Sequence, residues 1–169
     1  MMESVLVTII QYKEIMLYNQ LNHFNDKSHE ALMSVWWGGV LLRQYARNFF
    51  SRTELPSEAQ FNVLLLLKYA EKPLTQVELS ERLLVDKSNL TGLIDRLERA
   101  NLLQRVINTG DRRRKMVELT ADGRALFEKI EKPYRNQIHQ LMSVFKPEEL
   151  ATLTNLMCKL HQALGEADK

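Results

Sequence analysis

Two short helices joined by a tight turn are the feature of this sequence that most restricts its fold. Residues 75–78 read TQVE, a capping box in which the Thr75 hydroxyl and the Glu78 carboxylate each accept a hydrogen bond from a free backbone N–H. The helix that follows is short, because Asp86 is a favourable N-cap for a second helix, KSNLTGLIDRLERAN. The pattern predicts a helix-turn-helix.

The second of these helices is apolar on one side and polar on the other. Leu90, Leu93 and Leu97 recur at spacings of three and four residues, and together with Ile94 they predict one buried face. The polar residues are then expected on the outside, within reach of solvent or a partner. These are Lys87, Ser88, Asn89, Thr91, Asp95 and Arg96.

A β-hairpin is predicted directly after the helix-turn-helix. The segments LLQRVI and KMVELT are short and β-prone, and in the second of them apolar and polar residues alternate. Between them, NTGDRRR contains the turn formers Asn108, Gly110 and Asp111. The hairpin would form a wing whose tip carries an arginine run. Such a run is often only a solvated surface, so its role depends on its neighbours.

Long helices are expected on both sides of this central part. Apolar residues repeat at helical spacing over residues 28–50, and the apolar stretch after Pro56 predicts a core helix. Thr120 is expected to cap a long helix, and Pro147 to begin a last one. The predicted fold is mainly α with a small β-hairpin wing, a winged helix-turn-helix flanked by N- and C-terminal helices.

Composition and charge narrow the functional classes. The formal net charge of +2 excludes strongly basic proteins that coat nucleic acid by charge alone, but leaves room for a local basic patch. Cys158 is the only cysteine, so no intramolecular disulfide is expected, and Glu3 stands where a signal peptide would carry positive charge. No apolar run approaches the roughly 18 residues that indicate a membrane span. We therefore expect a cytoplasmic protein without a membrane partner.

The sequence offers no group of residues that would support catalysis or bind a cofactor. The four histidines are scattered and lack the spacing of metal ligands. There is no nucleotide-binding glycine pattern and no recognisable pair of nucleophile and base. We expect neither an enzyme, nor a metal site, nor a cofactor.

Several motifs in one order resemble those of the multiple antibiotic resistance regulator (MarR) family. They lie in LTQVELSERLLVDKSNLTGLIDRLERANLLQRVINTGDRRRKMVELTADGRALFEKI, about a third of the chain. The most specific parts are LIDRLERANLL and an Asp-x-Arg wing, formed here by Asp111 and Arg113 and followed by a strand and LTADG. The resemblance implies a DNA-binding transcriptional regulator.

The resemblance also implies a homodimer in which the end helices interlock and two winged domains straddle a pseudo-palindromic operator. The expected organisation is a helical extension over 1–27, dimerisation helices over 28–54 and 121–169, and a winged helix-turn-helix over 55–120. The regulator is expected to be a repressor that a small-molecule ligand releases from DNA. A winged-helix module that binds protein and not DNA is the alternative, because a fold alone does not fix a function.

The positions that match the family's DNA-contacting residues lie in the second short helix and in the wing. The resemblance places the helix in the major groove, where Lys87, Ser88, Asn89 and Thr91 would contact DNA. It places Arg113 in the minor groove, with Asp111 orienting the wing through an ion pair. The neighbouring basic residues would contact phosphates or nothing. These are Arg112, Arg114 and Lys115.

Two departures from the family pattern stand out. Many members carry a long polar or basic residue in the middle of the recognition helix, where this chain has Gly92. Glycine cannot reach a base, and it weakens a helix by roughly 1 kcal/mol relative to alanine. Either the backbone approaches DNA closely at this point, or fewer bases are contacted. The N-terminal segment of about 25 residues, beyond the usual family start, is the second departure, and added dimer surface is the mildest interpretation of it.

The sequence leaves two interpretations open for a group of large side chains in the 28–50 helix, and two for the single cysteine. Met33, Trp36, Trp37 and Tyr45 lie on the helix that borders a ligand pocket in this family, so they either line a pocket for a small aromatic or amphipathic effector or pack in the core and dimer interface. Cys158 has Lys159 and His161 nearby, so it is either a redox-responsive thiol or an inert one.

Overall fold

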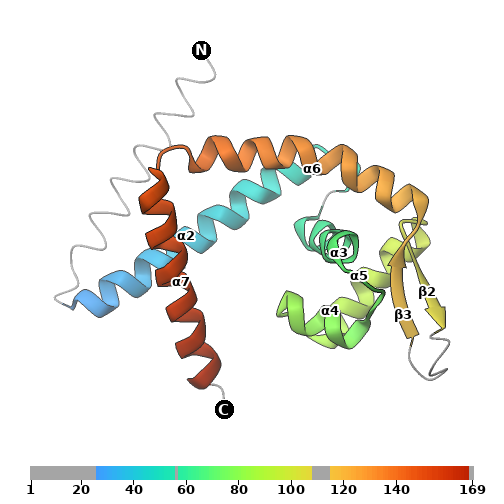
Figure 1. Cartoon of the computed structure of the whole chain (residues 1–169), viewed down its shortest axis with the longest axis horizontal. Coiled ribbons are helices and arrows are strands. Elements are labelled where there is room, and N and C mark those ends of the chain that lie inside the picture. Colours follow the sequence, from blue (N-terminus) through green and yellow to red (C-terminus); the bar gives the residue numbers. More distant parts are fainter. Residues whose placement is uncertain (1–25, 56, 108–114, 168–169) are drawn as a thin grey trace. The chain divides into compact units, whose positions relative to one another are not determined.

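A computed structural model describes residues 26–55, 57–107 and 115–167. The described chain is mainly helical, with a small antiparallel sheet, which confirms the predicted fold class (Figure 1). It divides into two compact units, one ending at Glu58 and the other beginning at Ala59. No helix in the described ranges is long and apolar enough to cross a membrane.

The described part of the first unit forms the long helix α2 (Lys27–Phe50), close to the predicted range of 28–50. Its N-cap is Asp26, whose carboxylate accepts a 2.8 Å hydrogen bond from the backbone N–H of Ser28. Only Ala46 and Phe50 are buried along this helix. The predicted extension over 1–27 lies outside the described residues, except for Asp26 and Lys27.

The second unit begins in the first turn of α3 (Glu58–Tyr69), which is a core helix as predicted. Strand β1 (Leu74–Thr75) leads into α4 (Gln76–Leu83), and the turn after α4 leads into α5 (Lys87–Arg99). The capping box of α4 is confirmed, because Glu78 N–H donates to the Thr75 hydroxyl over 3.1 Å and Thr75 N–H donates to the Glu78 carboxylate over 2.7 Å. The helix-turn-helix therefore starts where the sequence predicts it.

The hairpin of β2 (Leu103–Ile107) and β3 (Lys115–Leu119) is antiparallel, with Leu103 opposite Leu119 and Ile107 opposite Lys115. The two-residue β1 pairs with the other edge of β3 and completes the sheet in the order β1-β3-β2. The sequence prediction missed β1, because two residues are too few to show an alternating pattern. The tip of the wing, residues 108–114, lies outside the described residues.

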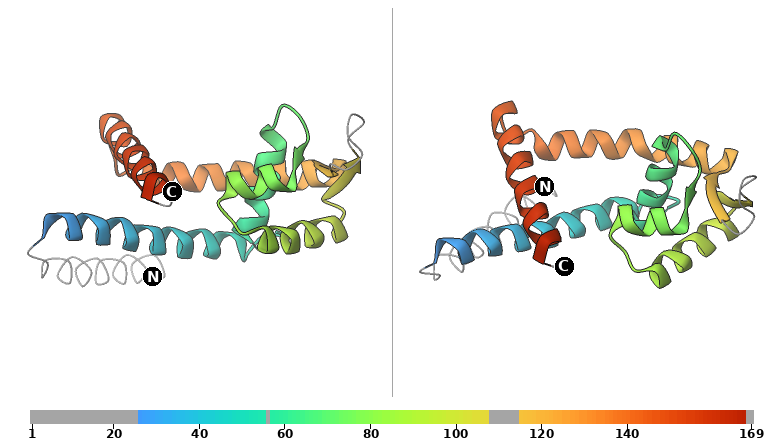
Figure 2. Two further views of the ribbon diagram at one scale, coloured as in Figure 1. Left: turned by 90° about the horizontal axis from the view of Figure 1, so that it is seen from below. Right: turned by 60° about the horizontal axis from the view of Figure 1, so that its bottom comes forward.

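Helix α6 (Ala121–Met142) begins beside the hairpin (Figure 2). Its predicted cap is confirmed, since Gly123 N–H donates to the Thr120 hydroxyl over 2.9 Å. Phe127 then stacks on Phe61 of α3, with ring centroids 5.1 Å apart. The core of the second unit is formed by α3, α4, α5, the sheet and this first half of α6. Its buried apolar residues are Phe61, Val63, Leu64, Leu67, Leu74, Leu79, Leu90, Leu93, Ile94, Leu97, Leu103, Val117, Leu119, Phe127 and Ile130.

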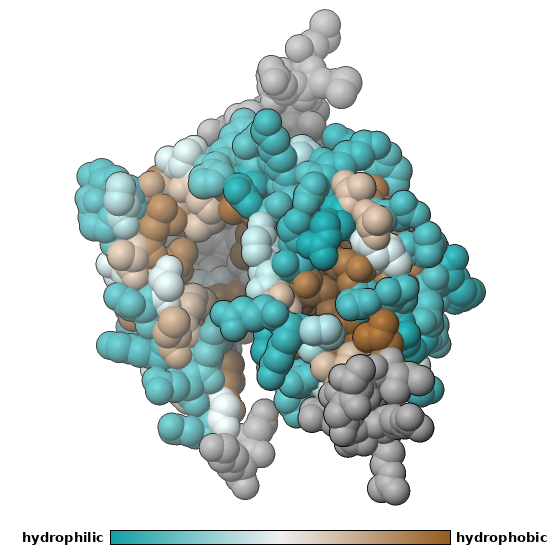
Figure 3. All heavy atoms as spheres, turned by 45° about the vertical axis from the view of Figure 1, so that its right-hand side comes forward, coloured by the Kyte–Doolittle hydropathy of each residue, from teal (hydrophilic) through white to brown (hydrophobic). Residues whose placement is uncertain are grey.

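The last helix, α7 (Pro147–Ala167), begins at the predicted proline. No described residue is buried in α7, or in α6 beyond Ile130. Figure 3 shows one face of the molecule, where hydrophilic side chains cover most of the surface and apolar ones reach it in patches. The exposed large apolar residues of the long helices include Leu32, Val35, Trp36, Leu41, Leu42, Ile138, Leu153, Leu156 and Leu164.

Candidate nucleic-acid interface

Helix α5 presents a polar surface because its apolar side is used by the core. Leu90 and Ile94 are almost completely buried, as are Leu93 and Leu97, which confirms the predicted inward face. The predicted DNA-contacting residues of this helix are all exposed. They are Lys87, Ser88, Asn89 and Thr91, within the first turns of α5. A helix with a buried apolar side and exposed polar residues at its N-terminal end can place that end in the major groove of DNA.

The four side chains differ in what they can offer to a base or phosphate. Lys87 carries a positive charge, and the Asn89 amide has both donors and an acceptor. The Thr91 hydroxyl donates to the Lys87 carbonyl over 2.8 Å, so its proton is used inside the helix and its oxygen is left as an acceptor. Asp86 occupies the predicted N-cap position, but its carboxylate makes no capping hydrogen bond. The capping role predicted for the Asp86 side chain is therefore wrong.

Arg105 of β2 joins the wing to α5, and the sequence prediction missed it. Its guanidinium lies 2.5 Å from a carboxylate oxygen of Asp95 and also forms an ion pair with Glu98. The backbone N–H of Arg105 donates to Glu98 as well. The hydrogen bond to Asp95 raises the pKa of Arg105 further, and burial opposes that rise. The partners are separated by seven and ten residues, so no helical or strand spacing in the sequence indicates the contact.

The Arg105 contacts set the charge balance of this surface. Asp95 and Glu98 are the carboxylates in the middle and last turn of α5, and both are paired with the same guanidinium. Arg96 and Arg99 are exposed on the same helix. Pairing reduces the repulsion that two carboxylates would exert on DNA phosphates, while the exposed arginines add attraction.

The predicted wing residues lie outside the described part of the chain. These are Asp111, Arg112, Arg113 and Arg114. Ile107, the last residue of β2, pairs with Lys115, the first residue of β3, and Lys115 is exposed. The hairpin follows α5 closely, since β2 begins after a short turn at the C-terminal end of that helix.

Comparison with known proteins identifies the family. A family model described as "MarR family" matches residues 57–115. The transcriptional repressor YetL of Bacillus subtilis is 32% identical over 139 residues, which are 82% of this chain and 83% of that protein. The chain belongs to the MarR family.

Further similarities agree with this membership. The multiple antibiotic resistance protein MarR of Salmonella typhimurium is 34% identical over 114 residues, 67% of this chain and 78% of its own length. The fold is shared with the PcaV transcriptional regulator of Streptomyces coelicolor, solved in complex with its natural ligand, with a TM-score of 0.66 and 23% identity over 83% of this chain and 94% of that one. This MarR-family chain is a transcriptional regulator and not an enzyme, as predicted.

The predicted pocket residues lie along α2 of this MarR-family regulator. Met33, Trp37 and Tyr45 are half-buried, whereas Trp36 is 63% exposed. An indole with that much exposed apolar area lacks cover within the described single chain. An effector in a pocket and a second copy in a dimer interface would each cover Trp36, whereas its exposure does not favour packing in the core of the described chain.

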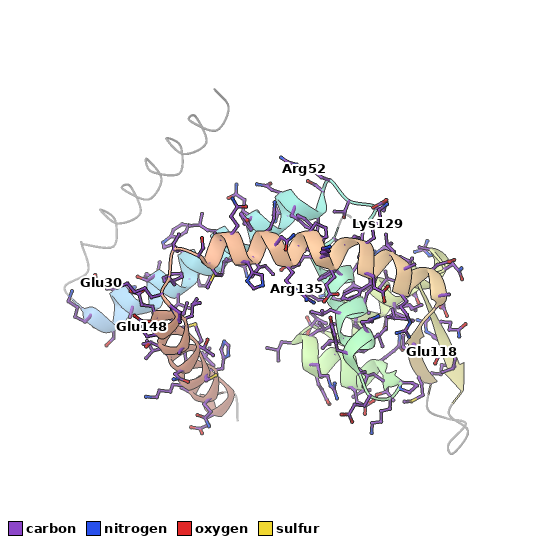
Figure 4. The ribbon with its side chains drawn as sticks, turned by 45° about the horizontal axis from the view of Figure 1, so that its top comes forward. Glu30, Arg52, Glu118, Lys129, Arg135 and Glu148 are labelled. Carbon is purple, nitrogen blue, oxygen red and sulfur yellow. The ribbon has the colours of Figure 1, made fainter. Side chains whose placement is uncertain are left out.

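A polar cluster joins α3 to α6, and it was also missed by the sequence prediction. Tyr69 donates its hydroxyl hydrogen to Glu131, and Arg135 forms an ion pair with the same carboxylate and lies 3.4 Å from the Tyr69 oxygen. Figure 4 shows Arg135 on the side of α6 that is near α3. The hydrogen bond from Tyr69 lowers the pKa of Glu131, with a further contribution from Arg135. One turn away, Lys68 pairs with Glu128, so the end of α3 is tied to α6 at two points.

Metal sites and reactive thiols depend on His, Cys, Asp and Glu side chains and on their surroundings. Within the described ranges, no three or more His, Cys, Asp or Glu residues are placed to hold a metal ion. Cys158 is exposed on α7. Exposure is one requirement of a reactive cysteine, but a cationic neighbour is the other.

Proposed function

We propose that this MarR-family regulator is a homodimeric repressor that binds a pseudo-palindromic operator and is released from it by a small ligand. The observation that carries the proposal is the first part of α5. Its apolar side is used by the core, and its first turn leaves Lys87, Ser88 and Asn89 exposed. YetL, which is similar to this chain over 82% of its length, is a repressor, and this supports repression over activation.

The proposed DNA contacts combine this helix with the wing. Asn89 and Ser88 would donate to and accept from base edges in the major groove, and Lys87 would contact a phosphate. Thr91 would contribute its hydroxyl oxygen. Arg113 would enter the minor groove, with Asp111 orienting the wing and Arg112 and Arg114 near phosphates. An action on DNA is consistent with the cytoplasmic location expected from the sequence.

The long helices support the proposed homodimer. Trp36, Leu42 and Leu156 are all more than half exposed in one chain, and they belong to helices with few or no buried residues. Large apolar side chains gathered on long helices usually indicate an interaction surface. A second copy of the chain would supply the same apolar surface and bury both. Two winged parts would then be available for two half-sites, about 34 Å apart on B-form DNA.

A ligand would act by changing the distance between the two recognition helices. If it binds the conformation whose helices do not match successive major grooves, it lowers DNA affinity, and DNA lowers ligand affinity by the same factor. The proposed site includes Met33, Trp36, Trp37 and Tyr45, which favour a small aromatic or amphipathic effector. The PcaV structure, which holds that protein's natural ligand in this fold, is a reason to search for one.

A mobility-shift experiment tests the DNA-binding proposal. The purified chain is mixed with DNA from upstream of its own gene and with unrelated DNA, each at several salt concentrations. We expect specific binding that weakens as salt rises, because phosphate contacts release counterions. Absence of any salt-dependent shift would favour the winged-helix module that binds protein and not DNA. A thermal-shift screen with small aromatic acids then tests for an effector, since a ligand of the folded dimer raises its melting temperature.

The redox alternative rests on the exposed thiol of Cys158. It predicts that a mild hydroperoxide abolishes operator binding and that Cys158→Ser prevents this loss. If the wild-type chain keeps its DNA affinity under the same treatment, Cys158 has no part in release and the small-ligand mechanism stands alone.

A further inference from the structure

The outward side of α5 contains a glycine that the fold does not explain. Gly92 is two residues from Leu90 and two from Ile94, which at about 100° per residue places it opposite both buried side chains. Ser88 and Arg96, four residues before and after it, are exposed on the same side. Gly92 is therefore near the centre of the surface that the proposed function directs at DNA.

Two common reasons for a glycine do not apply at this position. A Cβ built on Gly92 has no neighbour within 4 Å, so the chain itself leaves room for a side chain. No glycine in the described residues has a positive φ, so the backbone does not require glycine here. Glycine also weakens a helix interior relative to alanine. The helix thus carries a weakening residue for which its own fold gives no reason.

Gly123 is an example of a glycine that the packing of the chain itself requires. A Cβ on Gly123 would overlap the backbone carbonyl of Leu102, so this glycine permits the close contact between α6 and the residue before β2. Gly92 has no such contact. Gly38, Gly39 and Gly165 also have room for a Cβ, so the open space does not by itself distinguish Gly92. What distinguishes it is its place between the exposed Ser88 and Arg96 on the polar side of α5, where a group outside the chain could approach the backbone.

We propose that Gly92 is a specificity-determining residue, at which the α5 backbone approaches the edge of a base pair in the major groove. The inference rests on the proposed function. A base edge is favoured over a phosphate because Gly92 faces straight away from the core, where the floor of the groove would lie when the helix enters it. A side chain at this point would hold the helix away from that floor and weaken the contacts of Asn89 and Ser88 with bases.

The test compares Gly92→Ala with Gly165→Ala in the full-length chain. Gly165 is also in a helix and has no neighbour within 4 Å of a built Cβ, so it matches Gly92 in these two respects. It differs in lying on α7 and in being exposed, whereas Gly92 is half-buried. Melting temperature and oligomeric state are measured for both variants. Binding is measured on an operator selected from random DNA with the wild-type chain, and on unrelated DNA.

We expect neither variant to lower the melting temperature, because alanine favours a helix. Gly92→Ala is expected to lower operator affinity by about tenfold, with little change on unrelated DNA, and Gly92→Leu to lower it further. Gly165→Ala should bind as the wild type does.

Operator affinity of Gly92→Ala equal to or above that of the wild type would overturn the inference and leave the proposed function intact. An equal loss on operator and unrelated DNA would also overturn it, because a phosphate and not a base edge would then approach the helix. If the wild-type chain binds no DNA at all, the proposed function and this inference fail together.

Discussion

The exposed residues at the start of α5 divide by chemistry into a charged and a neutral group. Lys87 can contribute Coulomb attraction to any phosphate, whereas Asn89 can form a bidentate pair with an adenine edge. Removing Lys87 and removing Asn89 should therefore change DNA binding in different ways. Their close spacing in one helix makes them a matched pair for mutagenesis.

We expect Asn89→Ala to lower operator affinity by about 1–3 kcal/mol and to relax base preference at one position. Lys87→Ala should weaken binding to operator and unrelated DNA alike, and reduce the slope of log K against log salt by about 1. Salt titrations on both DNAs measure each quantity. Identical profiles for the two variants would contradict this division of roles.

Gly123 gives a prediction about stability alone. Alanine at this position would overlap the Leu102 carbonyl, which belongs to the backbone and cannot rotate away as a flexible side chain could. Gly123→Ala should therefore lower the free energy of unfolding by about 3 kcal/mol. Denaturant titration measures the change, with Gly165→Ala as a control expected to unfold no earlier than the wild type. A stable Gly123→Ala variant would show that α6 can shift at low cost.

At the level of elements, α5 and β2 are held together by Arg105. Its side chain is 23% exposed and reaches two carboxylates, so this ion pair is better shielded than one at the open surface. We expect a double-mutant cycle of Arg105→Met and Glu98→Gln to give a coupling energy of about 1 kcal/mol in thermal or denaturant unfolding. Additive effects of the two substitutions would show that the ion pair contributes nothing to the wing's attachment.

The contact between α3 and α6 predicts a pH dependence. The folded-state pKa of Glu131 is lowered from 4.5, so the unfolded chain binds more protons in the window between the two values. The stabilisation is thus fully present above pH 4.5 and is lost as the pH falls through the folded-state pKa. Glu131→Gln should be less stable than the wild type at neutral pH, and the difference should shrink in acid.

Equilibrium unfolding at a series of pH values measures this difference. Tyr69→Phe keeps the ring packed against Phe127 but removes the hydroxyl donor, so it should show a smaller fall in stability with acid than the wild type. If the difference in unfolding free energy between the wild type and Glu131→Gln stays constant as the pH falls into the acid range, the proposed role of Glu131 is contradicted.

For the whole molecule, the central prediction is dimerisation through the end helices. Leu153→Asp places a charge on the apolar side of α7, where a partner copy is proposed to pack, and should shift the chain towards monomer. Asn155→Asp adds the same charge on the other side of α7 and should leave the dimer intact. Analytical ultracentrifugation distinguishes the two, and circular dichroism checks that both variants remain helical. Dimers of equal strength would exclude this side of α7 from the interface.

Much of the fold could be predicted from local sequence. The capping box at Thr75, the apolar spacing of α5, the hairpin and the cap at Thr120 are all confirmed, because each depends on residues close in the chain. The exposed residues of α5 follow from the same periodicity. The exception at this scale is Asp86, whose position as N-cap is right but whose carboxylate makes no capping bond.

Contacts between elements far apart in sequence were decided only by the tertiary structure. Nothing in the sequence pairs β1 with β3, Arg105 with Asp95, or Tyr69 with Glu131, because these partners meet only after the helices and strands have packed. The sequence by itself determined the helices of the described chain, the two strands of the hairpin and the polar side of α5, since periodicity and capping are local properties. It did not determine β1, which is a strand only because it pairs with β3. Tertiary packing decided that Gly123 is required by a neighbouring backbone while Gly92 is not, since the room around a residue depends on distant parts of the chain.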